Sequence, residues 1–268
     1  MKSTTGIASA QSKREIVADK GVRIEVISEG AGPLVVILPS RGRDSEDYDE
    51  VAAGIVTAGY RVLRPQPRGT GASRGPMNGL TLHDFARDVA AVIEHAGGGP
   101  AVVVGHAFGN WIARMTAADH PRLVRGVAIL AAAAKTYPKA LAEAVTRSAD
   151  VTLPDAERLK YLCSTFFAPG HDASVWLQGW YPEVNASQFA AGRATKQEEW
   201  WGAGSAPLLD LQAAFDPFKP RETTNELKDE LGDRVTIVVI PDASHALIPE
   251  QPAAVVEAIV GWMRKLQS

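Results

Sequence analysis

Short runs of apolar residues alternate along this chain with stretches of helical periodicity. The continuous apolar run Leu34–Leu38 predicts a strand that is buried on both faces, and Val102–Val104 and Leu123–Leu130 predict two further buried strands. Between them, Glu46–Ala58 can form a helix, and the stretch that follows Thr81 has the one-sided apolar pattern of a surface helix. This alternation predicts parallel βαβ units, and hence an α/β fold in which helices cover both faces of one mostly parallel sheet.

The two ends of the chain extend this pattern. Near the start, Arg14–Asp19 and Val22–Ser28 alternate apolar and polar residues, which predicts a hairpin. The other predicted elements are strands at Tyr60–Leu63, Pro207–Ala213 and Val235–Ile240, and helices at Asn110–Asp119, Arg221–Leu231 and Ala253–Leu266. We therefore expect one domain over residues 1–268, with a core of about 13–134 and 206–268.

The alternation stops between about Lys135 and Ser205, where the sequence is helical in propensity and rich in aromatic residues. Four of the six tryptophans lie in this stretch. A helical insertion could need these rings only for its own packing. We favour a helical lid over about 135–205, whose underside forms an apolar pocket.

The sequence Gly105-His-Ala-Phe-Gly109 lies between a buried strand and a predicted helix. Two glycines around such a turn are typical of the nucleophile elbow, Gly-x-Ser-x-Gly, which holds a serine hydroxyl above the end of a parallel sheet. Here Ala107 occupies the serine position. A methyl group cannot attack a carbonyl carbon, so the turn is present without its nucleophile.

A carboxylate and a histidine follow the last two predicted strands. Asp216 comes shortly after Pro207–Ala213, and His245 comes shortly after Val235–Ile240. Because parallel strands end at the same edge of a sheet, we expect both side chains to lie near Ala107. Elbow, acid and base then occur in the chain order of one of the known catalytic triads.

These motifs together resemble the α/β-hydrolase superfamily, and in particular small bacterial hydrolases with helical lids. The resemblance covers essentially the whole chain and includes the stretch from His245 to Pro252. It implies that Ala107, Asp216 and His245 are the triad positions. It also implies an oxyanion hole formed by the backbone amides of Phe108 and of the loop Pro39-Ser40-Arg41, which departs from the usual His-Gly pattern. We assign the loop donor to Arg41, with Ser40 and Arg43 as neighbours that could replace it.

The expected function is hydrolysis of a small, partly apolar carbonyl substrate, either an ester, an amide or a carbon–carbon bond. We expect Trp176 and Trp180 of the aromatic insertion to contact the substrate. Two explanations of the alanine at position 107 stay open: the chain is an engineered inactive variant, or the alanine is native. With native alanine, His245 and Asp216 could act as a general base without a covalent intermediate, as in lyase-like or cofactor-free oxygenase-like relatives, or the chain could be a ligand-binding pseudoenzyme.

The composition of the chain limits the classes of partner and cofactor that we expect. The net charge of −3 argues against nucleic acid, because there is no basic excess to neutralise phosphates. A single cysteine, Cys163, in which we expect a buried or idle thiol, rules out an internal disulfide. No run has the length of a signal peptide core or a membrane span, so we expect a cytoplasmic protein. We expect no metal and no cofactor, and the sequence leaves a homodimer open.

Several other polar residues could carry chemistry. We interpret His106 as a packing or hydrogen-bonding residue, and Ser244 as a weak candidate for a substitute nucleophile. Arg41, Arg43 and Arg68 could meet an anionic substrate near the strand ends, although loop arginines are more commonly solvated. The glycine-rich turn after Arg68 lacks the Gly-Lys-Ser/Thr ending of a nucleotide-binding loop, which argues against phosphate binding.

Overall fold

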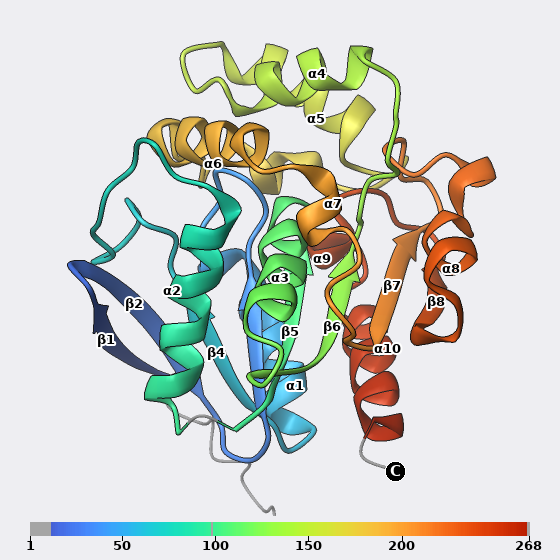
Figure 1. Cartoon of the computed structure of the whole chain (residues 1–268). Coiled ribbons are helices and arrows are strands. Elements are labelled where there is room, and N and C mark those ends of the chain that lie inside the picture. Colours follow the sequence, from blue (N-terminus) through green and yellow to red (C-terminus); the bar gives the residue numbers. More distant parts are fainter. Residues whose placement is uncertain (1–11, 98, 267–268) are drawn as a thin grey trace, which may run out of the picture.

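The computed structural model of this chain describes residues 12–97 and 99–266 and contains one eight-stranded sheet (Figure 1). The strands lie in the order β1-β2-β4-β3-β5-β6-β7-β8. The first two strands pair antiparallel and β2 pairs antiparallel with β4, whereas every pair from β4 to β8 is parallel. Their bounds are β1 Lys13–Asp19, β2 Val22–Glu29, β3 Leu34–Leu38, β4 Arg61–Pro65, β5 Ala101–His106, β6 Val124–Leu130, β7 Leu208–Ala213 and β8 Val235–Ile240. The α/β fold is thus confirmed.

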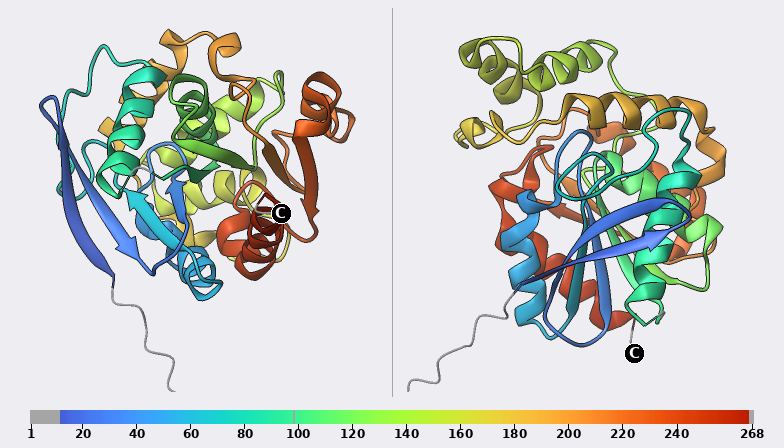
Figure 2. Two further views of the ribbon diagram at one scale, coloured as in Figure 1. Left: turned by 60° about the horizontal axis from the view of Figure 1, so that its bottom comes forward. Right: turned by 90° about the vertical axis from the view of Figure 1, so that its left-hand side faces the viewer.

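Helices cover both faces of this sheet (Figure 2). On one face, α2 (Leu82–His95) and α3 (Phe108–Asp119) pack in a core that includes Val36 and Leu38 of β3. On the other face, α1 (Asp49–Thr57) and α10 (Pro252–Lys265) pack in a core that includes the alternate residues Val35 and Ile37. Successive strand side chains point to opposite faces, so the continuous apolar run of β3 supplies both cores.

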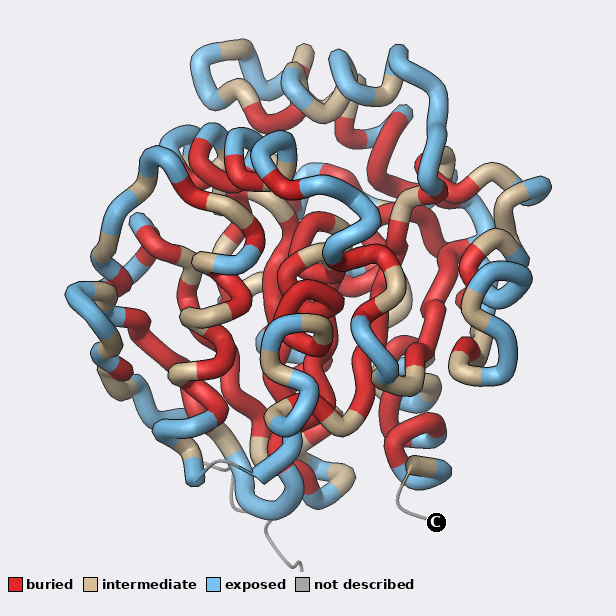
Figure 3. The backbone as a smooth tube through the Cα atoms, in the orientation of Figure 1, coloured by how far each residue is buried: buried red, intermediate tan, exposed pale blue. Residues whose placement is uncertain are grey.

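The stretch between β6 and β7 lies over the carboxyl ends of the parallel strands (Figure 1). Its outer surface is largely exposed, whereas the strand ends beneath it are buried (Figure 3). It contains α4 Ala140–Ala149, α5 Asp155–Thr165, the 3-10 turn Ala173–Trp176, α6 Pro182–Ala194 and α7 Gln197–Trp200. The longest helices of the described residues, α2 and α10, have 14 residues each, and none of the described helices has the length and hydropathy needed to cross a membrane.

Most predicted elements are found with boundaries shifted by one or two residues, but the helix predicted over Arg221–Leu231 is interrupted. A 3-10 turn covers Arg221–Thr223, and α8 begins only at Glu226 and ends at Leu231. Between them, the Thr224 carbonyl accepts a hydrogen bond of 2.8 Å from Nε2 of Gln212 on β7. The Gln212 side chain thus donates to a carbonyl that would accept an N–H within a continuous helix. Such a contact between distant residues cannot be predicted from sequence periodicity.

Gly109, in the first turn of α3, lies against the loop that follows β3. A Cβ atom at this position would come within 2.5 Å of the Leu38 carbonyl oxygen and 2.6 Å of the Pro39 carbonyl oxygen. Because these are backbone atoms, only a shift of α3 or of the loop could relieve the clash. The missing side chain therefore sets how closely the elbow approaches this loop.

We expect Gly109→Ala to lower the free energy of unfolding by about 3 kcal/mol, the upper part of the range for overpacking. Gly261→Ala is the matched control, because Gly261 is exposed on α10 and a Cβ there would meet no atom within 4 Å. Alanine is the better helix former, so this control should gain about 0.5–1 kcal/mol. Urea denaturation of both variants measures the difference, and equal stabilities would contradict the close packing at Gly109.

Candidate active site

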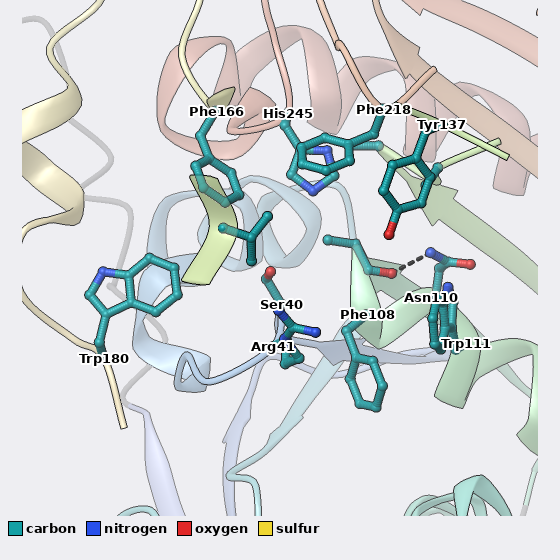
Figure 4. A pocket seen from close by; sticks show the side chains of 14 residues that line it. Ser40, Arg41, Phe108, Asn110, Trp111, Tyr137, Phe166, Trp180, Phe218 and His245 are labelled. Atoms are coloured by element: carbon teal, nitrogen blue, oxygen red, sulfur yellow. Dashed lines mark hydrogen bonds between the residues drawn. The ribbon is translucent and has the colours of Figure 1, made fainter. Parts of the chain in front are cut away.

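The elbow holds Ala107 in a backbone conformation that L residues rarely adopt. Residue 107 lies between the end of β5 and the start of α3, with φ 48° and ψ −114°. Its N–H donates to the Leu130 carbonyl at 2.9 Å, and its carbonyl accepts from the Asn110 side chain (Figure 4). A non-glycine residue at positive φ costs of the order of 1–3 kcal/mol. The chain retains this strained turn although the side chain that it presents to the pocket is a methyl group.

The structure brings Asp216 and His245 together beside Ala107. Oδ2 of Asp216 lies 3.0 Å from Nδ1 of His245, and the Asp216 side chain is fully buried. Oδ1 of the same carboxylate accepts from the Phe218 N–H at 2.9 Å. A carboxylate only accepts, so Nδ1 carries the proton and Nε2 keeps a lone pair. His245 also lines the pocket that Ala107 lines (Figure 4), so this lone pair is available to a reactant.

The loops that carry the acid and the base are bonded to each other. Phe215 N–H donates to the Ala243 carbonyl at 2.9 Å, and the Ser244 hydroxyl donates to the Phe215 carbonyl at 3.1 Å. The Ser244 hydroxyl is therefore engaged away from the pocket, which argues against its use as a substitute nucleophile. The Phe218 ring packs on the His245 imidazole with 4.4 Å between ring centres. These contacts fix the imidazole before any ligand binds.

Glu250 ties the histidine loop to the insertion above it. Its carboxylate accepts from the Ser244 N–H at 2.7 Å and from the Ala168 N–H at 2.5 Å. Next to it, the Ala246 N–H donates to the Phe166 carbonyl at 2.7 Å. Burial raises the pKa of Glu250, although both amide donors oppose that shift. The base and the aromatic residues of the insertion are thus held in one hydrogen-bonded unit.

A buried chain of hydrogen bonds connects the loop after β3 to the backbone of His245. The Ser40 N–H donates to the Tyr48 hydroxyl oxygen at 2.9 Å, and that oxygen lies 2.7 Å from Nδ1 of His106. Nε2 of His106 lies 2.8 Å from the His245 carbonyl. Since a carbonyl only accepts, Nε2 carries the proton and Nδ1 accepts from the tyrosine. Burial, followed by the charge of His245, lowers the pKa of His106 to about 3. The expected hydrogen-bonding role of His106 agrees with this neutral position.

The pocket is mostly apolar and has two backbone donors at its edge. Its lining comprises Ser40, Arg41, Ala107, Phe108, Asn110, Trp111, Ala131, Ala133, Tyr137, Val145, Phe166, Trp180, Phe218 and His245. In the loop after β3, the Ser40 N–H is taken by Tyr48 and the Gly42 N–H by Oε1 of Gln188 at 2.7 Å. Within the described residues, the N–H groups of Arg41 and Phe108 have no acceptor. Free amides at these two positions are what a developing oxyanion needs.

The structure separates the two tryptophans that we expected to contact substrate. Trp180 lines the pocket, but Trp176 lies behind it, among Phe166, Phe167 and His106. The Trp176 carbonyl accepts from Nε1 of Trp180 at 2.6 Å, so Trp176 supports the ring that meets the pocket. Trp176 therefore does not line this pocket, and its contact with a substrate stays a prediction.

Other sequence candidates are engaged elsewhere. Nε of Arg68 pairs with Asp88 at 2.7 Å, and in the glycine-rich turn that follows, the Ala72 N–H donates to the Glu25 carboxylate at 2.5 Å. A carboxylate at this turn disfavours phosphate there. Cys163 is exposed on α5, not buried. Within the described residues, no group of three or more His, Cys, Asp or Glu side chains could hold a metal ion.

Several residues of the site were given no role in the sequence analysis. Tyr48 bonds to His106, Phe218 packs on His245, and Glu250 accepts from the loop of His245. A polar residue at a buried helix position is a weak signal that could have indicated Tyr48 or Glu250.

The neutral His106 makes stability depend on pH. The unfolded chain binds a proton at this residue near pH 6.5, whereas the folded chain does so only at about pH 3. Stability is therefore full above pH 6.5 and is lost as the pH falls toward 3, by about 2 kcal/mol between pH 7 and pH 5. We expect His106→Gln to be less stable at pH 7 but to show a flatter pH profile in urea denaturation. His95→Gln, at an exposed histidine, is the control, and identical profiles for all three proteins would contradict the buried neutral imidazole.

Comparison with known proteins agrees with this architecture. A family model described as alpha/beta hydrolase fold matches residues 33–162. The non-heme haloperoxidase of Rhodococcus erythropolis is 26% identical over 254 residues, which cover 87% of this chain and 92% of that protein. The structure of E-2-(acetamidomethylene)succinate hydrolase superimposes with a TM-score of 0.79 at 19% identity, covering 95% of this chain and 100% of that one.

A thermophilic esterase from Thermogutta terrifontis, solved with malate bound, superimposes with a TM-score of 0.77 at 23% identity, covering 97% of this chain and 100% of that one. At these identities the two structures support the fold alone. The full-length relative, the family model and the order of elbow, acid and histidine around one pocket point to the same family. The chain therefore has the α/β-hydrolase fold and is similar to members of that superfamily.

Proposed function

We propose that this chain is a hydrolase of a small, partly apolar carbonyl compound and that it works without a covalent intermediate at residue 107. The observation that carries the proposal is the Asp216–His245 pair, 3.0 Å apart, beside a pocket in which the nucleophile position is Ala107. The acid and base are in place for proton transfer, while the elbow side chain has no atom that could attack.

In the proposed reaction, water takes the role of the elbow hydroxyl. Nε2 of His245 accepts a proton from this water while its oxygen attacks the carbonyl carbon, and Asp216 stabilises the imidazolium that forms. The N–H groups of Arg41 and Phe108 donate to the oxyanion. When the tetrahedral intermediate collapses, the imidazolium returns its proton to the leaving alkoxide, amine or carbanion, so an ester, an amide or a carbon–carbon bond adjacent to a carbonyl fits the same sequence of steps.

The insertion between β6 and β7 is the candidate for a lid over this site. We propose that α4 and α5 are the mobile part of this lid. The α6 side is bonded to the core, for example from Ser187 Oγ to the Met77 carbonyl at 2.6 Å and from the Leu82 N–H to Thr195 Oγ1 at 2.9 Å. In contrast, the hydrogen bonds of residues 140–165 stay within residues 138–167. This pair rests on apolar contacts, through Leu141, Val145 and Leu159 among others. Apolar contacts are non-directional, so they can open and reform at low cost.

The names of similar proteins favour hydrolysis as the reaction class. One of the superimposed structures is a hydrolase of an acetamido compound and another is an esterase. Both names describe enzymes that cleave a bond with water, which is the reaction class that we propose for this chain.

Ala107 also favours a second candidate function, that of a non-catalytic ligand-binding protein. A pocket with Trp180 and Phe166 on its wall can hold an apolar ligand without reacting with it. The two functions differ in whether His245 is needed for turnover, and this difference can be measured.

We expect the chain to hydrolyse p-nitrophenyl esters slowly, and His245→Ala to lower kcat/KM by about 100-fold, the low end of general-base contributions. His83→Ala is the matched control, because Nδ1 of His83 also pairs with an aspartate, Asp119 at 2.7 Å, but on an exposed face of α2. This control should keep full activity. The rate of p-nitrophenolate release measures the activity of the unmodified chain and of both variants.

Ala107→Ser separates the remaining outcomes. If only Ala107→Ser is active, the general-base proposal is wrong and the chain is a hydrolase whose nucleophile has been removed. If neither protein is active but apolar ligands raise the Tm of the unmodified chain, the binding protein is favoured. Activity of the unmodified chain that survives His245→Ala would contradict the proposed role of the histidine.

A further inference from the structure

The pocket has an unequal charge balance. Of its lining side chains, Arg41 is the only one that is permanently charged, and none is a carboxylate. Asp216 is shielded behind His245, with its side chain fully buried. In the part of the chain that the structure describes, the wall of this apolar pocket therefore has one cation and no anion to balance it.

Arg41 has no anionic partner among the described residues, unlike Arg43 and Arg68, the two other arginines predicted near the strand ends. Arg43 is bonded to Asp47 at 2.6 Å and to the Gln178 carbonyl at 2.7 Å, and Arg68 is bonded to Asp88. Within the described residues, the Arg41 side chain makes neither a hydrogen bond nor an ion pair. Its recorded contact is the ring of Phe189, whose centre lies 5.2 Å from the guanidinium carbon.

Leaving a half-buried guanidinium without an anion has a physical cost. Burial lowers the pKa of Arg41, which shows that its surroundings disfavour the charged form. A guanidinium remains protonated at neutral pH despite such a shift, so it keeps both its charge and its unused N–H donors. A ligand anion in the pocket would satisfy both.

We propose that Arg41 binds a carboxylate of the substrate, so that the pocket takes a small apolar acid carrying the reactive carbonyl group. This inference rests on the proposed function for the reaction, although not for the binding. The planar guanidinium fork matches a carboxylate in a bidentate pair. One cation balances one carboxylate, whereas a phosphate dianion would leave a negative charge in apolar surroundings, which is why a carboxylate is favoured.

Tyr137 gives the proposed subsite a second donor. Its ring packs edge-on against Phe218 with 5.3 Å between centres, and Figure 4 shows its hydroxyl directed toward the interior of the pocket. Arg41 also supplies the free backbone N–H at the oxyanion position. Because one residue serves both the oxyanion and the acid, the carboxylate must lie only a few bonds from the reacting carbonyl.

Binding is tested first, with phenylacetate and its uncharged analogue phenylacetamide, by isothermal titration calorimetry on the full chain. We expect phenylacetate to bind about 10- to 100-fold more tightly, the range for a hydrogen bond to a charged group. Arg41→Gln should remove this preference. Arg193→Gln is the matched control, because Arg193 is exposed and its guanidinium also lies over the Phe189 ring, at 5.9 Å, yet Arg193 is absent from the pocket lining. It should leave the preference unchanged.

Three binding results would overturn the proposal: equal affinity for the acid and the amide, no binding of either probe, or a preference for the acid that survives Arg41→Gln. Tighter Arg41-dependent binding of phenylphosphonate would replace the carboxylate with a phosphoryl group and also overturn it. Because these measurements need no turnover, the inference can hold when the proposed hydrolysis fails. If the chain hydrolyses uncharged esters but does not prefer acids, the proposed hydrolysis holds and the carboxylate-binding role of Arg41 fails.

Turnover then distinguishes the side chain of Arg41 from its backbone. We compare p-nitrophenyl hemisuccinate, which carries a carboxylate, with the uncharged p-nitrophenyl butyrate. Arg41→Gln should lower kcat/KM for the hemisuccinate about 10-fold or more relative to kcat/KM for the butyrate, mainly through KM. An equal loss on both esters would show that the substitution disturbs the oxyanion loop, and would contradict a carboxylate-binding role.

Discussion

The close approach of α3 to the loop after β3 is the constraint on which the rest of the site depends. It is possible because Gly109 has no side chain to meet the carbonyls of Leu38 and Pro39. This contact places the amide of Phe108, at the start of α3, on the same pocket as Arg41 of the loop. If α3 lay further away, these two free amides could not donate to one oxygen atom, as the proposed reaction requires.

The histidine is fixed from several directions, and each support comes from a different part of the chain. Asp216 accepts from Nδ1 of His245, and Nε2 of His106 donates to the His245 carbonyl. Glu250 accepts from the Ser244 N–H and so holds the histidine loop against the insertion. Preorganisation of this kind lowers the reorganisation needed during proton transfer. It also means that a movement of the insertion near Ala168 would be transmitted directly to the loop of His245.

The sequence predicts those features that depend on chain order and periodicity. The strands, the elbow and the meeting of Asp216 with His245 follow from where apolar runs end, because parallel strands bring their carboxyl ends together. Features that depend on packing are not predictable in this way. Trp176 and Trp180 are alike in sequence, yet one supports the other, and of the two loop arginines only Arg43 is bonded to an acid, Asp47. The break at Thr224 likewise depends on a side chain of another strand.

The methyl group of Ala107 has a consequence for how such a protein is found. Reagents that label serine hydrolases form a covalent bond to an activated elbow hydroxyl, and residue 107 has no oxygen to form it. The strained backbone, the acid and the histidine can all be intact while the chain stays unmodified by a fluorophosphonate. A census of hydrolases made by covalent labelling would therefore pass over this chain, although its fold and its base would place it within the group being counted.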